Sequence, residues 1–273
     1  MTPPQNAGSR SRVSNPQQVT LPWLKIAVGV VSLTVVLVIS LFGWHQLEQF
    51  LIHDSRFGVN GPDGAEDASV IQIQGAQHAS RRAIEGAFAD DLGRSLYLLP
   101  LEGRRATLRS VDWVKDATVM RLWPNRVLVR VAERKPVAFV TLGARYGLID
   151  EDGVILPPAT DRFHLPVLQG VNARDGLGDR RDRVQRMLRL LRALGNNAEK
   201  IAEVNATDRE DLRVTQPYNS RMVTLLLGDR NFAVRYQNFL NHYSEIREKM
   251  PGANSLDLRI EDRITVVEQK TDE

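Results

Sequence analysis

The chain has 273 residues, of which 42% are hydrophobic, which is enough for two small domains with buried cores. Its 36 basic and 33 acidic side chains leave a formal charge of only +3, so composition gives no case for binding nucleic acid. There is no cysteine, which excludes disulfides, thiolate metal sites and a cysteine nucleophile.

The strongest local signal is a charge-free apolar run from Ile26 to Trp44. As a helix this run is about 28 Å long, close to the thickness of the hydrocarbon core of a bilayer. A cleaved signal peptide is the alternative, but the run is longer than a usual signal core and no small-residue cleavage site follows it. We therefore predict an uncleaved transmembrane helix over residues 25–45, anchored near its ends by Ile26 and Trp44.

Charges on the two sides of this helix predict its orientation. Arg10, Arg12 and Lys25 precede it, whereas acidic residues outnumber basic ones over 48–67. Because positive flanks stay in the cytoplasm, the N-terminus is expected inside and the rest of the chain outside. Residues 1–24 have the composition of a disordered cytoplasmic tail. Residues 46–68 are rich in glycine and acids toward their end and are predicted to be a flexible linker.

Residues 69–135 predict a small domain in the order strand, helix, helix, strand, strand. Ile71 and Ile73 alternate with glutamines, as in a half-buried strand. Ser80 can cap the first helix, and Pro100 can open the second. Two strands then follow in VDWVKDATVMRLWP and NRVLVRVAERKP. Two helices covering one face of a three-stranded sheet would bury a sufficient core.

Residues 136–260 change to a pattern of short strands with two amphipathic helices, at 182–194 and 231–248. We predict a mostly antiparallel sheet with helices packed on one face, so the whole chain is of the α+β class. The strand-like run 255–260 comes last, and residues 261–273 are predicted to be a C-terminal tail. A last strand can lie at a sheet edge and accept an extended partner segment, although Asp257, Arg259 and Glu261 could instead protect that edge from aggregation.

No pattern of catalytic, cofactor-binding or metal-binding residues is evident. The five histidines are isolated, and the phosphate-loop, zinc-protease and serine-hydrolase motifs are missing. The acidic stretch from Asp150 to Gly153 lacks the spacing of a calcium loop, and a hairpin turn explains it better. The sequence therefore predicts a protein that is not an enzyme and has no cofactor.

The segment VDWVKDATVMRLWPNRVLVRVAERKPVAFV resembles the signature of the FtsQ/DivIB family of bacterial cell-division proteins. The stretches LIDEDGVIL, LPVLQG and LDLRIEDRITV also resemble that family, in the expected order. The motif positions that carry the resemblance are Trp113, Trp123, Pro124, Glu133, Arg134 and Pro136.

This resemblance implies a POTRA domain at 69–135, a β-domain at 136–260 and no enzymatic activity. It implies a single-pass protein of the bacterial inner membrane at the division septum, with its domains in the periplasm. Such a protein links early cytoplasmic division proteins to later periplasmic ones, and its partners are FtsB and FtsL. The alternative is a POTRA-bearing accessory of polypeptide transport or secretion, but such proteins usually carry several POTRA modules and a barrel.

In the family, FtsB pairs along the last β-strand of the β-domain. Matching the sequence DLR carries this surface over to the present chain. One departure is Ile260, where some relatives have an aromatic residue, and Glu261-Asp262-Arg263 replaces a turn that contains glycine. The partner-binding residues implied by the match are Leu256, Asp257, Leu258, Arg259, Ile260, Glu261, Asp262 and Arg263.

Overall fold

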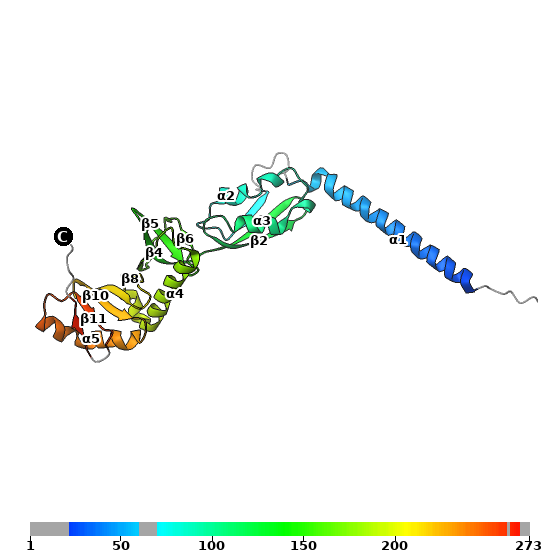
Figure 1. Ribbon diagram of the computed structural model, residues 1–273. Helices are drawn as coiled ribbons and strands as arrows, with labels where there is room; N and C mark the ends of the chain where they lie inside the picture. Colours follow the sequence, from blue (N-terminus) through cyan, green and yellow to red (C-terminus); the bar gives the residue numbers. More distant parts are fainter. Residues whose placement is uncertain (1–21, 60–69, 261–262, 268–273) are drawn as a thin grey trace, which may run out of the picture.

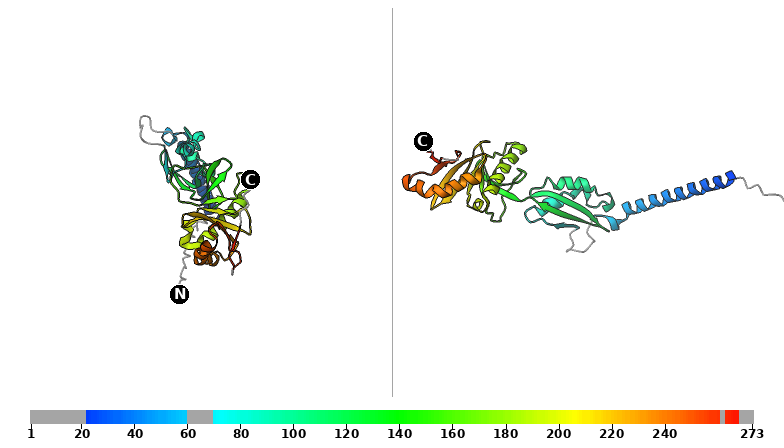
Figure 2. Two further views of the ribbon diagram at one scale, coloured as in Figure 1. Left: turned by 90° about the vertical axis from the view of Figure 1, so that its left-hand side faces the viewer. Right: turned by 90° about the horizontal axis from the view of Figure 1, so that it is seen from below.

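The computed structural model describes residues 22–59, 70–260 and 263–267, and shows an N-terminal helix followed by two domains in a row (Figure 1). The two further views confirm that the second domain lies at the far end of the molecule from this helix (Figure 2). Most of the predicted tail at 1–24, part of the predicted linker at 60–68, and both Glu261 and Asp262 lie outside the described residues.

Helix α1 spans Pro22–His53 and extends the predicted transmembrane segment by eight residues at its end. Its stretch Lys25–His53 is long and apolar enough to cross a membrane, and it fits a transmembrane segment. A short 3-10 helix, η1 (Ser55–Phe57), follows directly. The prediction of a flexible linker is therefore wrong for residues 46–59, because they form the end of α1 and a segment packed on the first domain.

The first domain confirms the predicted order of elements. They are β1 (Ile71–Gln74), α2 (Arg81–Gly86), α3 (Leu101–Leu108), β2 (Val114–Leu122) and β3 (Arg126–Glu133). The strands form a sheet in the order β1-β3-β2, with β1 parallel and β2 antiparallel to β3. Ser80 caps α2 by accepting a hydrogen bond from the Ala83 N–H, as predicted. Short 3-10 helices occupy Ala89–Asp91 (η2) and Leu96–Leu98 (η3).

The second domain contains a nine-stranded sheet among the described residues, with five of its eight strand pairings antiparallel. The sheet order is β12-β11-β10-β9-β8-β7-β4-β5-β6. The elements are β4 (Pro136–Leu142), β5 (Arg145–Asp150), β6 (Ile155–Leu156), β7 (Val167–Gln169), α4 (Leu177–Leu194), η4 (Gly195–Lys200), β8 (Glu203–Asn205), β9 (Leu212–Tyr218), β10 (Arg221–Gly228), α5 (Phe232–Lys249), β11 (Ser255–Asp257) and β12 (Thr265–Val266). Helices α4 and α5 pack together, and their apolar faces share one core with the sheet, which confirms the predicted α+β architecture.

The two domains share buried apolar contacts. Leu148 of β5 and Leu156 of β6 are buried in the same cluster as Trp113 and Val114 of the first domain. The β6 edge of the large sheet therefore faces the first domain. Its other edge, at β12, lies at the opposite end of the sheet.

Candidate partner-binding edge

The open edge of the large sheet belongs to β12. Strand β11 pairs in parallel with β10 on one side, with Leu225 opposite Leu256. On its other side β11 pairs antiparallel with β12, with Leu256 opposite Val266. No further strand pairs with β12 in the part of the chain that the structure describes. The backbone groups of β12 that point away from β11 are thus available for a hydrogen-bonded partner strand.

The prediction that the run 255–260 forms the sheet edge is wrong. Strand β11 ends at Asp257, and both of its sides are already paired. Leu256 and Leu258 are buried in the domain core, whereas Ile260 and Arg263 are exposed. The real edge strand falls inside the segment that we predicted to be a tail. The sequence signal that was available is the β-branched triplet Ile264-Thr265-Val266, which favours a strand.

The register of β12 shows which of its backbone groups face outward. The Val267 N–H donates to the Ser255 carbonyl at 2.9 Å, so Val267 is turned toward β11. In an antiparallel pair the direction of the backbone groups alternates, so those of Ile264 and Val266 point away from β11. The side chains of these two residues pack against the core, while Thr265 and Val267 are exposed. Strand β12 is therefore held to the core by its side chains, while its outward backbone groups are available to a partner strand.

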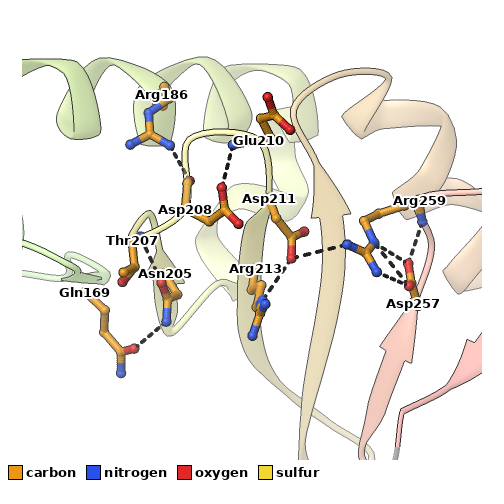
Figure 3. Close-up of polar contacts among 10 residues, drawn as sticks. All are labelled: Gln169, Arg186, Asn205, Thr207, Asp208, Glu210, Asp211, Arg213, Asp257 and Arg259. Carbon is orange, nitrogen blue, oxygen red and sulfur yellow. Dashed lines mark hydrogen bonds and ion pairs between the residues drawn. The ribbon is translucent and has the colours of Figure 1, made fainter.

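An ion-pair network holds β11 beside the neighbouring strands (Figure 3). The Arg259 guanidinium donates to both Asp257 carboxylate oxygens, at 2.6 Å for the closest contact. It also lies 3.7 Å from the buried carboxylate of Asp211, which accepts a hydrogen bond from Arg213. The hydrogen bond from Arg259 lowers the pKa of Asp257, and Asp257 in turn raises the pKa of Arg259. Both groups remain charged at neutral pH, so the network persists.

Arg235 of α5 fixes the segment that leads from β11 toward β12. Its guanidinium is buried and donates to the carbonyls of Leu227 at 2.6 Å and Arg259 at 2.8 Å. Gly228 leaves room for it, because a Cβ there would lie 2.6 Å from the Arg235 Nη1 and the backbone has a φ of +69°. The Leu258 N–H also donates to the Leu226 carbonyl, at 3.0 Å. The start of the edge is thus held by backbone carbonyls that accept hydrogen bonds from Arg235 and Leu258, although the buried Arg235 Nε has no partner.

A groove of about 440 Å³ lies between α5 and the segment just before β12. Its apolar part includes Ile246, Met250 and Ile264, and its polar rim includes Lys249, which pairs with Glu245 at 2.7 Å. This groove lies next to the open edge, because Ile264 lines the groove and directly precedes β12. A partner strand on β12 could place an apolar side chain there.

A second hollow, about 710 Å³, is formed by the loop between β8 and β9, but its polar groups are largely engaged with one another (Figure 3). Arg186 of α4 holds this loop by donating to the Asp208 carbonyl at 2.6 Å and the Ala206 carbonyl at 2.9 Å. Arg186 is buried, whereas Arg183, Arg189 and Arg192, which follow the same three-residue spacing along α4, are at least partly exposed.

Glu133 and Arg134 carry part of the family resemblance, and each connects segments that are far apart in the sequence. The Glu133 carboxylate accepts hydrogen bonds from the backbone N–H groups of Gln77, His78 and Ala79, at 2.7–2.8 Å. Burial raises the pKa of this carboxyl, but those hydrogen bonds and the His78 ring outweigh it and leave the pKa lowered. Arg134 pairs with the buried Asp150 of the second domain at 2.7 Å.

The other residues singled out in the sequence contribute to the structure and not to the open edge. Trp113 is buried and stacks on the His78 ring at 4.6 Å, and Pro136 begins β4 at the junction of the domains. Trp123 and Pro124 form the exposed turn between β2 and β3.

Ile26 and Trp44 are exposed on α1, as a membrane-spanning helix requires. The acidic stretch from Asp150 to Gly153 forms the turn between β5 and β6. The Asp150 carboxylate accepts hydrogen bonds from the N–H groups of Asp152 and Val154.

Within 22–59, 70–260 and 263–267, no cluster of three or more histidine, aspartate or glutamate side chains could hold a metal ion. The geometry thus combines an N-terminal helix that fits a transmembrane segment with an open strand edge, and places an ordered module between them.

Comparison with known proteins places this architecture in a family. Residues 68–134 match the POTRA domain of FtsQ type, and residues 138–259 match the C-terminal region of cell division protein FtsQ/DivIB. The chain belongs to the FtsQ/DivIB family of cell division proteins. Its first domain is accordingly called the POTRA domain below, and its second the β-domain.

Two cell division proteins named FtsQ and one solved structure are similar to this chain, and the assignment rests on the family models and the first of these relatives. Cell division protein FtsQ of Koribacter versatilis is 32% identical over 88% of this chain and 69% of its own length. FtsQ of Myxococcus fulvus is 27% identical over 65% of this chain and 62% of its own length. The solved extracytoplasmic domain of DivIB from Geobacillus stearothermophilus is 17% identical, covering 44% of this chain and 96% of that one, with a TM-score of 0.26.

Proposed function

We propose that this protein is a non-enzymatic scaffold of the bacterial divisome that recruits FtsB, together with FtsL, at the β12 edge. In this proposal α1 crosses the inner membrane with the N-terminus in the cytoplasm, and the two domains lie in the periplasm at the septum. The chain would then link early cytoplasmic division proteins to later periplasmic ones. The observation that carries the proposal is the outward-facing backbone of Ile264 and Val266 on a sheet that is otherwise paired up to β12.

The contact surface in this proposal is centred on residues 263–267. Arg259 and Ile260 flank it, whereas Leu256 and Leu258 act from the core by holding β11 in place. An extended segment of FtsB would add to β12 through backbone hydrogen bonds, which give affinity with little demand on side chains. The groove beside Ile264 would give specificity by receiving an apolar side chain.

Other strand edges are less suited to adding a partner strand. Strand β6 is covered by the first domain, because Leu156 is buried against the POTRA domain. Strand β2 is longer, but its register shifts between Val114 and Asp116. The Asp116 carboxylate also accepts the Ala117 N–H at 2.8 Å and pairs with arginines of α3 and its C-terminal end. Bulges and charges of this kind block edge pairing.

The absence of cysteine allows a direct test by disulfide crosslinking. Thr265→Cys in the full chain should form a disulfide with cysteines placed at alternate positions of the FtsB segment in dividing cells. Tyr146→Cys is the control, since Tyr146 is exposed on β5 far from β12 in the sheet order. Equal crosslinking at both positions, or none at Thr265, would contradict the proposed contact. A tagged chain should also form a ring at mid-cell, whereas a uniform envelope signal would favour a role in transport.

A further inference from the structure

The POTRA domain is fixed to the end of α1. The Ser95 hydroxyl donates to the Leu51 carbonyl of α1 at 2.6 Å, and Gly58 bridges to Ser95 as an isolated β-pair. Val59 is fully buried in the POTRA core, and its N–H donates to the Arg94 carbonyl at 2.8 Å. One end of the POTRA domain is therefore held at a set distance from the segment that crosses the membrane (Figure 1).

That distance is a few Å greater than the headgroup layer of a bilayer. Leu51 lies seven residues beyond Trp44, which is a helical rise of about 10 Å. The polar headgroup region on each side of the hydrocarbon core is about 5–7 Å thick. Helix α1 remains partly apolar over this stretch, with Leu47 and Phe50 exposed. With Trp44 at the edge of the hydrocarbon core, the POTRA end that touches α1 thus begins at the outer surface of the headgroup layer, where long side chains reach the headgroups.

The exposed large apolar side chains of the POTRA domain gather at this same end. They are Leu92, Leu98 and Trp123, each more than half exposed. Leu98 lies in η3, which contacts α1, and Leu92 precedes Gly93, whose N–H donates to the Val59 carbonyl. The Trp123 ring packs edge-on against Phe57 at 5.6 Å. Scattered exposed apolar residues are ordinary, but a cluster confined to one end indicates a contact surface.

The charges at this end complement an anionic surface. Arg94 and Arg126 are exposed, and no carboxylate pairs with either of them among the described residues. Asp54 is engaged by Arg56 at 2.8 Å, which lowers the pKa of Asp54 to about 2. Asp90 and Asp91, which precede Leu92, both pair with Arg104, and Glu48 lies on α1. Tryptophan and arginine are the side chains that favour the membrane–water interface, and arginine pairs with lipid phosphate.

From this combination we propose that the α1-facing end of the POTRA domain is a membrane-contact surface. Trp123, Leu98 and Leu92 lie against the headgroup layer of the bilayer that α1 crosses, and Arg94 and Arg126 bind the phosphates of anionic lipids there. The contact would set the tilt of the POTRA domain and, through the seam with the β-domain, the direction in which the molecule projects from the membrane. This role is independent of what binds at β12.

The test uses the full cysteine-free chain with single cysteines that carry a fluorophore, reconstituted into phosphatidylglycerol or phosphatidylcholine vesicles. Lipids brominated near the headgroup should quench the label at Leu98→Cys nearly as strongly as a label at Leu47→Cys, because Leu47 is exposed on α1 just beyond Trp44. The label at Tyr146→Cys in the β-domain should stay unquenched. Equal quenching at Leu98 and Tyr146, with Leu47 quenched, would overturn the proposal and leave the apolar end available for a protein.

A charge-reversed pair of variants separates the two parts of the contact. Arg94→Glu with Arg126→Glu should lose most of the quenching at Leu98 in phosphatidylglycerol vesicles, and Arg130→Glu with Lys135→Glu should not. Arg130 and Lys135 are matched exposed cations on or next to β3, toward the opposite end of the domain. If quenching is the same in both lipids and insensitive to the reversal, the proposed binding of anionic phosphate is refuted.

Discussion

Arg134 and Asp150 form an ion pair between the two domains, with 2.7 Å between the Arg134 Nη1 and the Asp150 Oδ2. The Asp150 side chain is 2% exposed, and its charge is compensated by Arg134 together with the N–H groups of Asp152 and Val154. This contact gives the Glu-Arg-x-Pro signature a physical role, because it locks the exit of the POTRA domain to the first hairpin of the β-domain.

Arg134→Ala should lower the free energy of unfolding by about 3 kcal/mol, because it leaves a buried carboxylate without its partner. Chemical denaturation of the full chain in nanodiscs, followed by near-ultraviolet circular dichroism, measures this change. Lys135→Ala is the matched control, since Lys135 is exposed, and it should change stability by less than about 0.5 kcal/mol. A similar small effect for both variants would show that the pair contributes little.

The stability of the domain seam should fall as the pH rises through the titration of His78. Its ring nitrogens lie 2.9 Å from Glu133 and 2.9 Å from Asp161 of the β-domain, and only the imidazolium can donate to both. Hydrogen bonding to Glu133, followed by that to Asp161, raises the pKa of His78 against the opposing effect of burial. A raised folded-state pKa means that the stabilisation is complete below the ordinary value of 6.5 and is lost as the pH passes the raised value.

Denaturation midpoints measured from pH 5.5 to 9 test this expectation. The wild-type chain should lose stability across the upper part of this range, and His78→Gln should show a flatter dependence because glutamine does not titrate there. An unchanged slope in the variant would mean that other groups cause the pH dependence. Trp113 and Phe163 also face the ring, and neither carries a charge.

Leu258→Ala should destabilise the β-domain by about 2–5 kcal/mol, as expected for a large core side chain. Leu258 is 2% exposed, whereas Ile260, two residues on, is 59% exposed and provides the matched control. Ile260→Ala should leave stability within about 0.5 kcal/mol of the wild type. Thermal denaturation of both variants measures the difference, and equal losses would mean that both side chains belong to the core.

The sequence predicted most of the fold because local signals agreed with the tertiary structure. Ser80 and Pro100 marked helix starts, and the alternation around Ile71 marked a strand at the place where the structure has one. The change of sequence pattern at Pro136 coincides with the start of β4. These features depend on residues close together in the chain.

The errors arose where long-range contacts decide the structure. The run 255–260 was predicted to be one strand, with Leu256, Leu258 and Ile260 on the same face. In the structure the strand ends at Asp257, and Arg235 donates a hydrogen bond to the Arg259 carbonyl instead. The glycine-rich and acidic composition after residue 53 suggested a linker that starts too early, because the burial of Val59 is invisible in composition.

The central claim is that β12 is the edge to which FtsB adds, and Val266→Pro tests it most directly. Proline removes an outward N–H and leaves the Val267 bond to Ser255 in place, with Val266→Ala as the control for the lost side chain. Binding of the FtsB–FtsL complex to the full chain in nanodiscs should weaken about tenfold for the proline variant relative to the alanine variant, as expected from one backbone hydrogen bond. Equal affinities of the two variants, both with wild-type melting temperatures, would contradict the account.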